Sequence, residues 1–168
     1  IPEDLKTLPD GACGLLVEAR GEDKPTVSGK VTRILNNIEN FTTIKPKEFT
    51  LDAKEQAILW KVRKEALPTI AGMRKSGTTS IIEDICFPVE KLADAGTDLR
   101  AVFDADGYQD AVIFGHALAG NLHFMFNQDF GTEEEVKKYA KFMDDVTDMV
   151  VNKYDGSLKA EHGPGRNM

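Results

Sequence analysis

Residues 109–129 read QDAVIFGHALAGNLHFMFNQD, with apolar side chains at alternate positions on either side of Ala119 and Gly120. This alternation predicts two antiparallel strands, 109–118 and 121–129, joined by a two-residue hairpin turn. One face of the hairpin should then meet the hydrophobic core, because alternate side chains of a strand point to the same face. The residues expected on that face are Ala111, Ile113, Leu122, Phe124 and Phe126.

Further strands and helices are expected on both sides of the hairpin. Short apolar runs bounded by Gly and Pro predict strands at 12–20, 42–50 and 78–88. Apolar residues at helical spacing predict helices, and Thr50 is expected to cap the second of them. The helices are expected at 24–41, 50–67, 89–104 and 132–154, and a mobile loop at 68–79. This order predicts an α+β fold, a mostly antiparallel sheet with helices on one face, as a ferredoxin-like (split βαβ) sandwich.

The composition is that of one globular domain of ordinary size, with 168 residues and a net charge of -7. An acidic surface repels phosphate backbones, so we expect no nucleic-acid partner. The sequence holds neither an apolar run long enough to cross a bilayer nor a signal-like start, so we expect a cytoplasmic protein.

Two further features concern the cysteines and the ends of the chain. Cys13 and Cys86 fit no paired-ligand spacing, and we expect both to be small buried hydrophobes. The chain starts without Met and stops in the Gly-rich run AEHGPGRNM, a loop that is costly to order unless it is anchored on both sides. These ends predict a fragment of a longer polypeptide.

His116 and His123 flank the predicted turn. If Ala119 and Gly120 form the turn, residue 118 pairs with 121, and two residues further along each strand His116 pairs with His123. We therefore expect the two imidazoles directly opposite each other on one face, with Cβ atoms about 4.5–5.5 Å apart. Two imidazoles at that spacing can chelate one transition metal. The alternative is that one or both are hydrogen-bonded core residues.

Glu161 and His162, in KAEHGPGR, add a hard oxygen donor and a third imidazole. Two histidines and a carboxylate leave open positions on a metal for substrate and solvent. Adjacent residues of an extended loop point opposite ways, so one of the two is expected on the metal and the other as a base. The alternative is a surface turn of ordinary polar residues.

Arg63, in LWKVRKE, is the remaining candidate. A guanidinium can clamp a substrate carboxylate with two parallel hydrogen bonds. The alternative is a solvated charge on a helix, and Trp60 on the same helix is expected to pack in the core rather than stack on a ligand. No Gly-rich phosphate motif follows a predicted strand, so we expect no nucleotide site in this chain.

Three stretches together resemble a known family. GHALAGNLHF and YDGSLKAEHGPGRNM, preceded by LWKVRKEA and EDICFPVEKL, are similar to the C-terminal substrate or cap domain of FAD-linked oxidases of the vanillyl-alcohol oxidase type. Within that family the chain most resembles D-lactate and D-2-hydroxyglutarate dehydrogenases and the flavin subunit of glycolate oxidase. The ending EHGPGRNM resembles especially the large bacterial members with an appended iron-sulfur domain.

The resemblance implies a domain over residues 1–168 that belongs to a longer chain, with FAD bound mainly by an upstream domain absent here. The implied reaction oxidises a D-2-hydroxy acid to the 2-oxo acid and passes hydride to the flavin. His116, His123 and Glu161 would hold zinc or manganese, His162 would be the catalytic base, and Arg63 would bind the substrate carboxylate. The full-length protein would carry an iron-sulfur cluster and lie in the cytoplasm, or at the inner membrane through an electron acceptor.

Three positions depart from relatives that are specific for 2-hydroxyglutarate. Where those relatives tend to carry Asn, Thr and Lys, this sequence has Met125, Leu67 and Ile82. An apolar pocket would suit lactate or another hydrophobic 2-hydroxy acid better than a substrate with a second carboxylate.

Two other functions remain as alternatives. The first is a stand-alone metal-binding or ligand-binding α+β module without redox activity. The second is a metal hydrolase in which Glu161 activates water, although no oxyanion site is visible in the sequence. We expect the isolated chain to be inactive as a dehydrogenase, because the flavin domain is absent.

Overall fold

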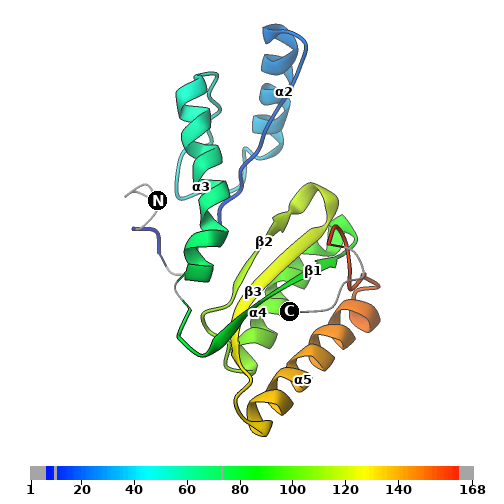
Figure 1. Ribbon diagram of the computed structural model, residues 1–168. Coiled ribbons are helices and arrows are strands. Elements are labelled where there is room, and N and C mark those ends of the chain that lie inside the picture. The colour runs from blue at the N-terminus through cyan, green and yellow to red at the C-terminus, as the bar shows by residue number, and fades with distance from the viewer. Residues whose placement is uncertain (1–6, 10, 73, 163–168) are drawn as a thin grey trace. The chain divides into compact units, whose positions relative to one another are not determined.

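The computed structural model describes residues 7–9, 11–72 and 74–162. The chain divides into two compact units, Ile1–Thr69 and Ile70–Met168. Figure 1 shows the helices of the first unit and the sheet of the second.

The described part of the first unit consists of the helix α2 (Lys24–Asn37), most of the helix α3 (Ala53–Gly72) and irregular chain. The carboxylate of Asp23 caps α2 by accepting the N–H of Thr26 at 2.9 Å. Asp52 caps α3, because its Oδ1 accepts the N–H groups of the second and third residues that follow it, at 2.8 and 3.0 Å. The prediction of Thr50 as the cap is therefore wrong by two residues, although the predicted helix is present.

Several predictions for the first unit are wrong. The stretches 12–20 and 42–50 form no strand, and their described side chains lie mostly exposed without a neighbouring strand to pair with. The predicted loop at 68–79 is shorter, because α3 continues past Pro68 to Gly72. Trp60 is 39% exposed rather than core-packed. Cys13 is exposed too, so only the half-buried Cys86 approaches the expectation for the cysteines.

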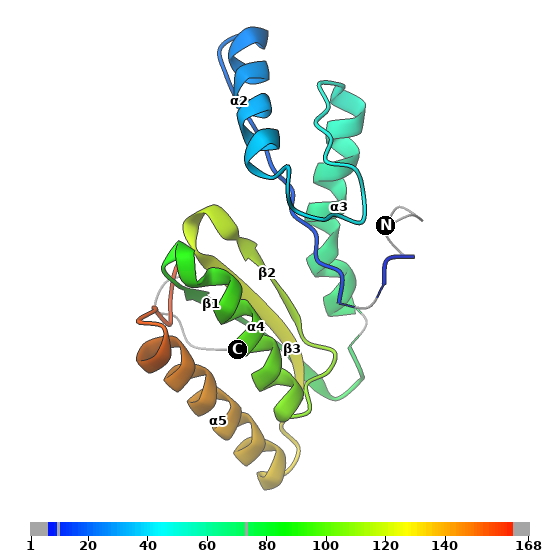
Figure 2. The same ribbon diagram turned by 180° about the vertical axis from the view of Figure 1, so that it is seen from behind.

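The second unit is a three-stranded antiparallel sheet with two helices on one face. The strands are β1 (Thr78–Cys86), β2 (Val112–His116) and β3 (Asn121–Asp129), in the spatial order β1-β3-β2. The helices are α4 (Leu92–Ala105), after the short η1 (Val89–Lys91), and α5 (Glu133–Asp148), which continues as the π-helical η3 (Met149–Lys153). Seen from behind, α4 lies over the sheet along the direction of its strands, and α5 runs alongside α4 (Figure 2).

These elements confirm the predicted α+β class, with an antiparallel sheet and helices on one face. The order β1-α4-β2-β3-α5 matches the first five elements of a split βαβ fold. In the place of the sixth, the chain after η3 makes one isolated antiparallel bridge, from Ser157 to Cys86 on β1. The complete ferredoxin-like sandwich stays a prediction.

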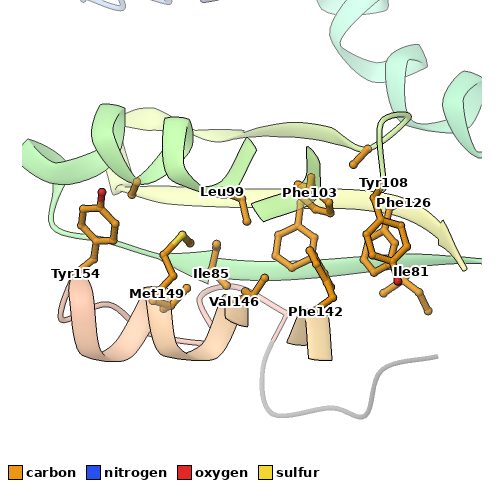
Figure 3. Close-up of a cluster of buried hydrophobic side chains, with 14 of the residues drawn as sticks. Ile81, Ile85, Leu99, Phe103, Tyr108, Phe126, Phe142, Val146, Met149 and Tyr154 are labelled. Atoms are coloured by element: carbon orange, nitrogen blue, oxygen red, sulfur yellow. The ribbon is translucent and has the colours of Figure 1, made fainter. Parts of the chain in front are cut away.

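The core lies between the sheet and the two helices. Phe103 of α4 is fully buried and contacts the rings of Phe124, Phe126 and Phe142, with centroids 4.8 to 5.6 Å apart (Figure 3). Phe124 and Phe126 come from the face of the hairpin that was expected to meet the core. Burial of this aromatic cluster fixes which face of β3 turns toward the helices, and therefore which face is left for polar groups. None of the described helices is both long and apolar enough to cross a membrane.

Candidate metal centre

The hairpin brings His116 and His123 to the face of the sheet opposite the helices. In the β2–β3 register, His116 pairs with Asn121 and Phe114 pairs with His123, so the two histidines are diagonal neighbours. The prediction that they lie directly opposite is wrong, because the loop has four residues instead of two. They still share a face, since the register differs from the predicted one by an even number of residues. Their ring centroids are 5.6 Å apart, and the rings are nearly perpendicular at 86°.

Gly120 sets the length of that loop. Residues Ala117–Ala119 form the short helix η2, and Gly120 closes it in the left-handed region with φ of 67°. Its carbonyl oxygen accepts the N–H of Phe87 at 2.8 Å, and a Cβ at this position would collide with the carbonyl oxygen of Phe87. The hairpin tip is therefore attached to the segment that follows β1.

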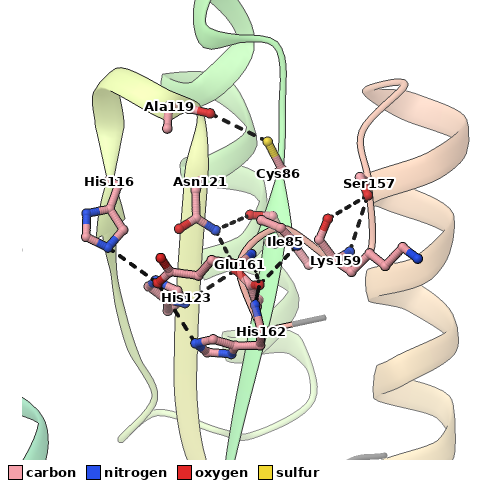
Figure 4. Close-up of polar contacts among 12 residues, drawn as sticks. Ile85, Cys86, His116, Ala119, Asn121, His123, Ser157, Lys159, Glu161 and His162 are labelled. Atoms are coloured by element: carbon pink, nitrogen blue, oxygen red, sulfur yellow. Dashed lines mark hydrogen bonds and ion pairs between the residues drawn. The ribbon is translucent and has the colours of Figure 1, made fainter. Parts of the chain in front are cut away.

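A second attachment brings the chain after η3 to the same face. The backbone groups of Cys86 and Ser157 exchange hydrogen bonds of 2.8 and 2.9 Å. Glu161 then reaches between the two histidines (Figure 4). Its Oε1 lies 2.9 Å from Nε2 of His123 and 3.4 Å from Nε2 of His116.

These three groups have a spacing that suits a metal ion. Two ligand atoms at about 2.0–2.1 Å from a tetrahedral metal are separated by about 3.3 Å, close to the two distances from Glu161. His116, His123 and Glu161 each offer one ligand atom, and these three atoms all lie within 4.8 Å of one another. His123 is buried, whereas the side chains of His116 and Glu161 are 46% and 54% exposed. The cluster thus has a buried side and an open side on which a small molecule could reach a bound ion.

His162 completes the cluster. Its ring stacks on that of His123 with centroids 4.8 Å apart and planes 20° apart. Its Nε2 is 4.0 Å from Oε1 of Glu161. The expectation that Glu161 and His162 point opposite ways is wrong, because the chain bends at 160–162 and both side chains lie beside His123.

Asp84 is a member of the site that the sequence analysis did not single out. Its buried carboxylate, on β1 directly opposite His123, accepts the backbone N–H groups of Ala160, Glu161 and His162 on Oδ2, at 3.0, 2.6 and 2.7 Å. Its Oδ1 accepts Nδ2 of Asn121 at 2.5 Å. The feature of the sequence that could have drawn attention to Asp84 is its position, as a charged residue inside the apolar run of a predicted strand.

The environment shifts the pKa values of two of these groups. Burial lowers the pKa of His123 below its ordinary value, and the nearby carboxylates oppose that effect only in part. Burial disfavours the charged form of Asp84, but its hydrogen bonds from His162, Asn121, Ala160 and Glu161 outweigh this and lower its pKa. His123 is therefore neutral, as a metal ligand must be, beside a charged aspartate.

A second set of possible ligands consists of Asp84, His123 and His162, which also lie within 4.8 Å of one another. Both oxygens of Asp84 already accept hydrogen bonds. The set with His116 and Glu161 is the better candidate, because its ligand atoms face an open side.

Arg63 lies on α3 and is exposed. It belongs to the first unit, whereas the histidine cluster belongs to the second. The structure brings His116, His123, Glu161 and His162 together, and their roles, like that of Arg63, stay predictions.

An α+β domain whose hairpin histidines meet a Glu-His pair is the arrangement that the resemblance led us to expect. The chain belongs to the family of FAD linked oxidases, C-terminal domain, whose model matches residues 2–168. This confirms the resemblance found in the sequence.

The chain is also similar to individual proteins of known name. The chain is 31% identical over 98% of its length to D-2-hydroxyglutarate dehydrogenase of Haemophilus influenzae, and 29% identical over 89% to that of Escherichia coli. It is 28% identical over 69% of its length to a glycolate oxidase subunit of Bacillus subtilis. The chain spans 16%, 15% and 24% of these three proteins.

Proposed function

We propose that this chain is the substrate-binding and catalytic cap domain of a flavin-dependent dehydrogenase that oxidises a D-2-hydroxy acid to the 2-oxo acid. The observation that carries the proposal is the convergence of His116, His123 and Glu161 on one small volume, with His162 beside it. The proposal of FAD as the cofactor rests on the family, and the proposed substrate class rests on the names of the relatives.

We assign a separate role in the reaction to each residue of the site according to its position. His116, His123 and Glu161 would hold a divalent zinc or manganese ion, which polarises the hydroxyl and carboxylate of the substrate when bound. His162 is proposed to accept the proton of the substrate hydroxyl at Nε2, and the distance of 4.0 Å from that atom to Oε1 of Glu161 supports this role. A flavin bound by the rest of the protein would supply the hydride acceptor for the substrate carbon. Arg63 is proposed to bind the substrate carboxylate.

The next row of the sheet suggests what the substrate carries beyond its 2-hydroxy acid group. Met125 pairs with Ile82 on one side and Val112 on the other, on the same face as His123 and two residues along each strand. Met125 is buried, whereas Ile82 is 39% exposed, so the apolar surface that this row offers next to the cluster lies at Ile82. The three side chains of this row are apolar, so a second carboxylate would lose hydration there without gaining a partner from them. This favours a lactate-like substrate over 2-hydroxyglutarate.

The remaining proposals concern the rest of the polypeptide. An FAD-binding domain of the same chain is the expected partner, and exposed apolar side chains of the first unit offer a surface for it. The largest of these exposures are at Leu15, Phe41, Ile44 and Leu51. An iron-sulfur cluster elsewhere in the protein, a cytoplasmic location and peripheral contact with the inner membrane through an electron acceptor belong to the same proposal.

A substrate screen of the intact, metal-loaded protein tests the function. D-lactate, D-2-hydroxyglutarate and glycolate are offered with an artificial electron acceptor, and reduction of that acceptor is followed by absorbance. We expect reduction by at least one of them, with the highest kcat/KM for D-lactate. Reduction by none would reject the proposed reaction, and a preference for D-2-hydroxyglutarate would reject the apolar-pocket argument alone.

A further inference from the structure

We infer that Asp84 is the positioning residue of the metal centre: one carboxylate holds both the buried histidine His123 and the segment that carries Glu161 and His162. The inference rests on the proposed function, because it assigns Asp84 a role in the same site. It concerns a residue that touches neither the substrate nor, in this arrangement, the ion.

Asp84 holds the backbone of the segment 160–162. Three consecutive backbone N–H groups converge on Oδ2 of Asp84, at 2.6 to 3.0 Å. Hydrogen bonds to a charged acceptor are about twice as strong as those between neutral groups. The bridge at Ser157 lies four residues before Glu161 and does not by itself fix where that side chain goes. Asp84 therefore determines the placement of Glu161 and His162.

The same carboxylate also lies beside the ring of His123. Nδ1 of His123 is buried, has no hydrogen-bond partner among the described residues and lies 3.5 Å from Oδ1 of Asp84. A small approach would let Nδ1–H donate to that oxygen, which leaves the lone pair on Nε2, the atom that lies 2.9 Å from Glu161. A carboxylate behind a metal-binding histidine commonly fixes its tautomer and orientation in this way.

An isosteric amide at position 84 could not do both tasks. If the amide oxygen faced 160–162, its NH₂ would face the NH₂ of Asn121, which now donates to Oδ1. If the amide were turned around, its NH₂ would face three N–H donors. Either orientation leaves buried donors unpaired, and the segment or the histidine must move.

The test measures two quantities on the intact protein for wild type, Asp84→Asn and the control Asp98→Asn. Zn²⁺ affinity is measured by competition with a chelating dye, and hydrogen exchange of the amides of 160–162 is measured by mass spectrometry on the metal-free protein. Asp98 is a suitable control because its carboxylate also accepts two hydrogen bonds, from Lys153 and Tyr154, away from the cluster. We expect Asp84→Asn to weaken Zn²⁺ binding about 10- to 100-fold and to speed exchange at 160–162. Asp98→Asn should change neither.

Three results decide the matter. Unchanged Zn²⁺ affinity in a folded Asp84→Asn protein, with wild type binding Zn²⁺, overturns the inference and leaves the proposed function intact. Absence of Zn²⁺ binding by wild type overturns the metal centre of the proposed function itself. If Asp84→Asn does not fold, Asn121→Ala, which removes the donor to Oδ1 and leaves the three backbone contacts, is expected to show a smaller loss of affinity, and no loss overturns the inference.

Discussion

His162 lies farther from the carboxylate of Glu161 than the two hairpin histidines do, and this difference supports a different role for it. His116 and His123 point Nε2 at the same carboxylate oxygen, which suits ligands of one ion. His162 stacks on a neighbour and keeps its Nε2 at 4.0 Å from that oxygen, which suits a group that exchanges a proton. The two roles can be separated by substitution.

Replacement of His162 by Ala is expected to lower kcat about 10²- to 10⁴-fold in the intact protein while the bound metal is retained, because a general base contributes that much. The measurements are steady-state turnover and metal content of the same sample. Lys159→Ala, an exposed change in the same segment, is the control. Unchanged turnover in His162→Ala would reject the assignment of the base.

Asp98 provides a residue-scale test of the link between pKa and stability. Hydrogen bonds from Lys153 and Tyr154 lower the pKa of Asp98 below 3.8 in the folded protein. The folded state then binds fewer protons than the unfolded state in that range, so this stabilisation is present above pH 3.8 and is lost as the pH falls through the lower folded value.

Urea unfolding of wild type and Asp98→Asn at a series of pH values checks this sign. We expect Asp98→Asn to be the less stable protein at pH 7 and the difference to shrink below pH 3.8. The control is Asp144→Asn, at an exposed position on α5. A difference that grows as the pH falls would contradict the assignment.

At the scale of elements, the hairpin shows which features of a strand pair can be predicted from the sequence and which cannot. Alternation along β2 and β3 correctly predicted two strands, the core face and a common face for both histidines. It could not predict the register, because a shift of two residues preserves every facing and depends only on the loop. That loop is set by Gly120, whose left-handed conformation and contact with Phe87 involve residues far apart in the sequence.

The wrong strands at 12–20 and 42–50 have a different cause. Both stretches have the composition of strands, but a strand exists only where a partner satisfies its backbone groups, and the sequence pattern does not reveal the partner. Asp84 was overlooked for a related reason. Its role arises from contacts with residues 76 to 78 positions away, which no local pattern records.

The substitution Gly120→Ala tests the account of the hairpin. A Cβ in the left-handed region costs about 1–3 kcal/mol, and the collision with the carbonyl oxygen of Phe87 adds to this cost. We expect a lower free energy of unfolding in urea and weaker metal binding, because the turn carries His116. Gly29→Ala is the matched control: it lies inside α2 with open space around its Cβ and should raise helix stability by about 0.5–1 kcal/mol. Equal effects of the two changes would contradict the account.

At the scale of the whole molecule, the two units differ in how many apolar side chains they bury. Among the described residues, the hydrophobic core lies between positions 81 and 154. None of the described side chains of residues 7–65 is buried, and α2 contributes nothing to a core. The second unit therefore has the means to fold by itself, whereas the first has little apolar burial to offset its loss of chain entropy.

Two fragments, 70–168 and 1–69, test this difference by thermal unfolding followed by circular dichroism. The fragment 70–168 is expected to unfold in one cooperative transition, and the fragment 1–69 is expected to show weak helicity that fades gradually. A cooperative transition in 1–69 would show that the first unit needs no partner, which would weaken the proposal that another domain covers it.

The central claim is that His116, His123 and Glu161 hold one divalent metal ion in the intact protein. Metal content by inductively coupled plasma mass spectrometry, on wild type, His116→Ala and His123→Ala purified without chelators, tests it most directly. We expect close to one zinc or manganese ion per chain in wild type and almost none in His123→Ala, whose ligand is buried, with a marked loss in His116→Ala. A full complement of metal in both variants would contradict the claim.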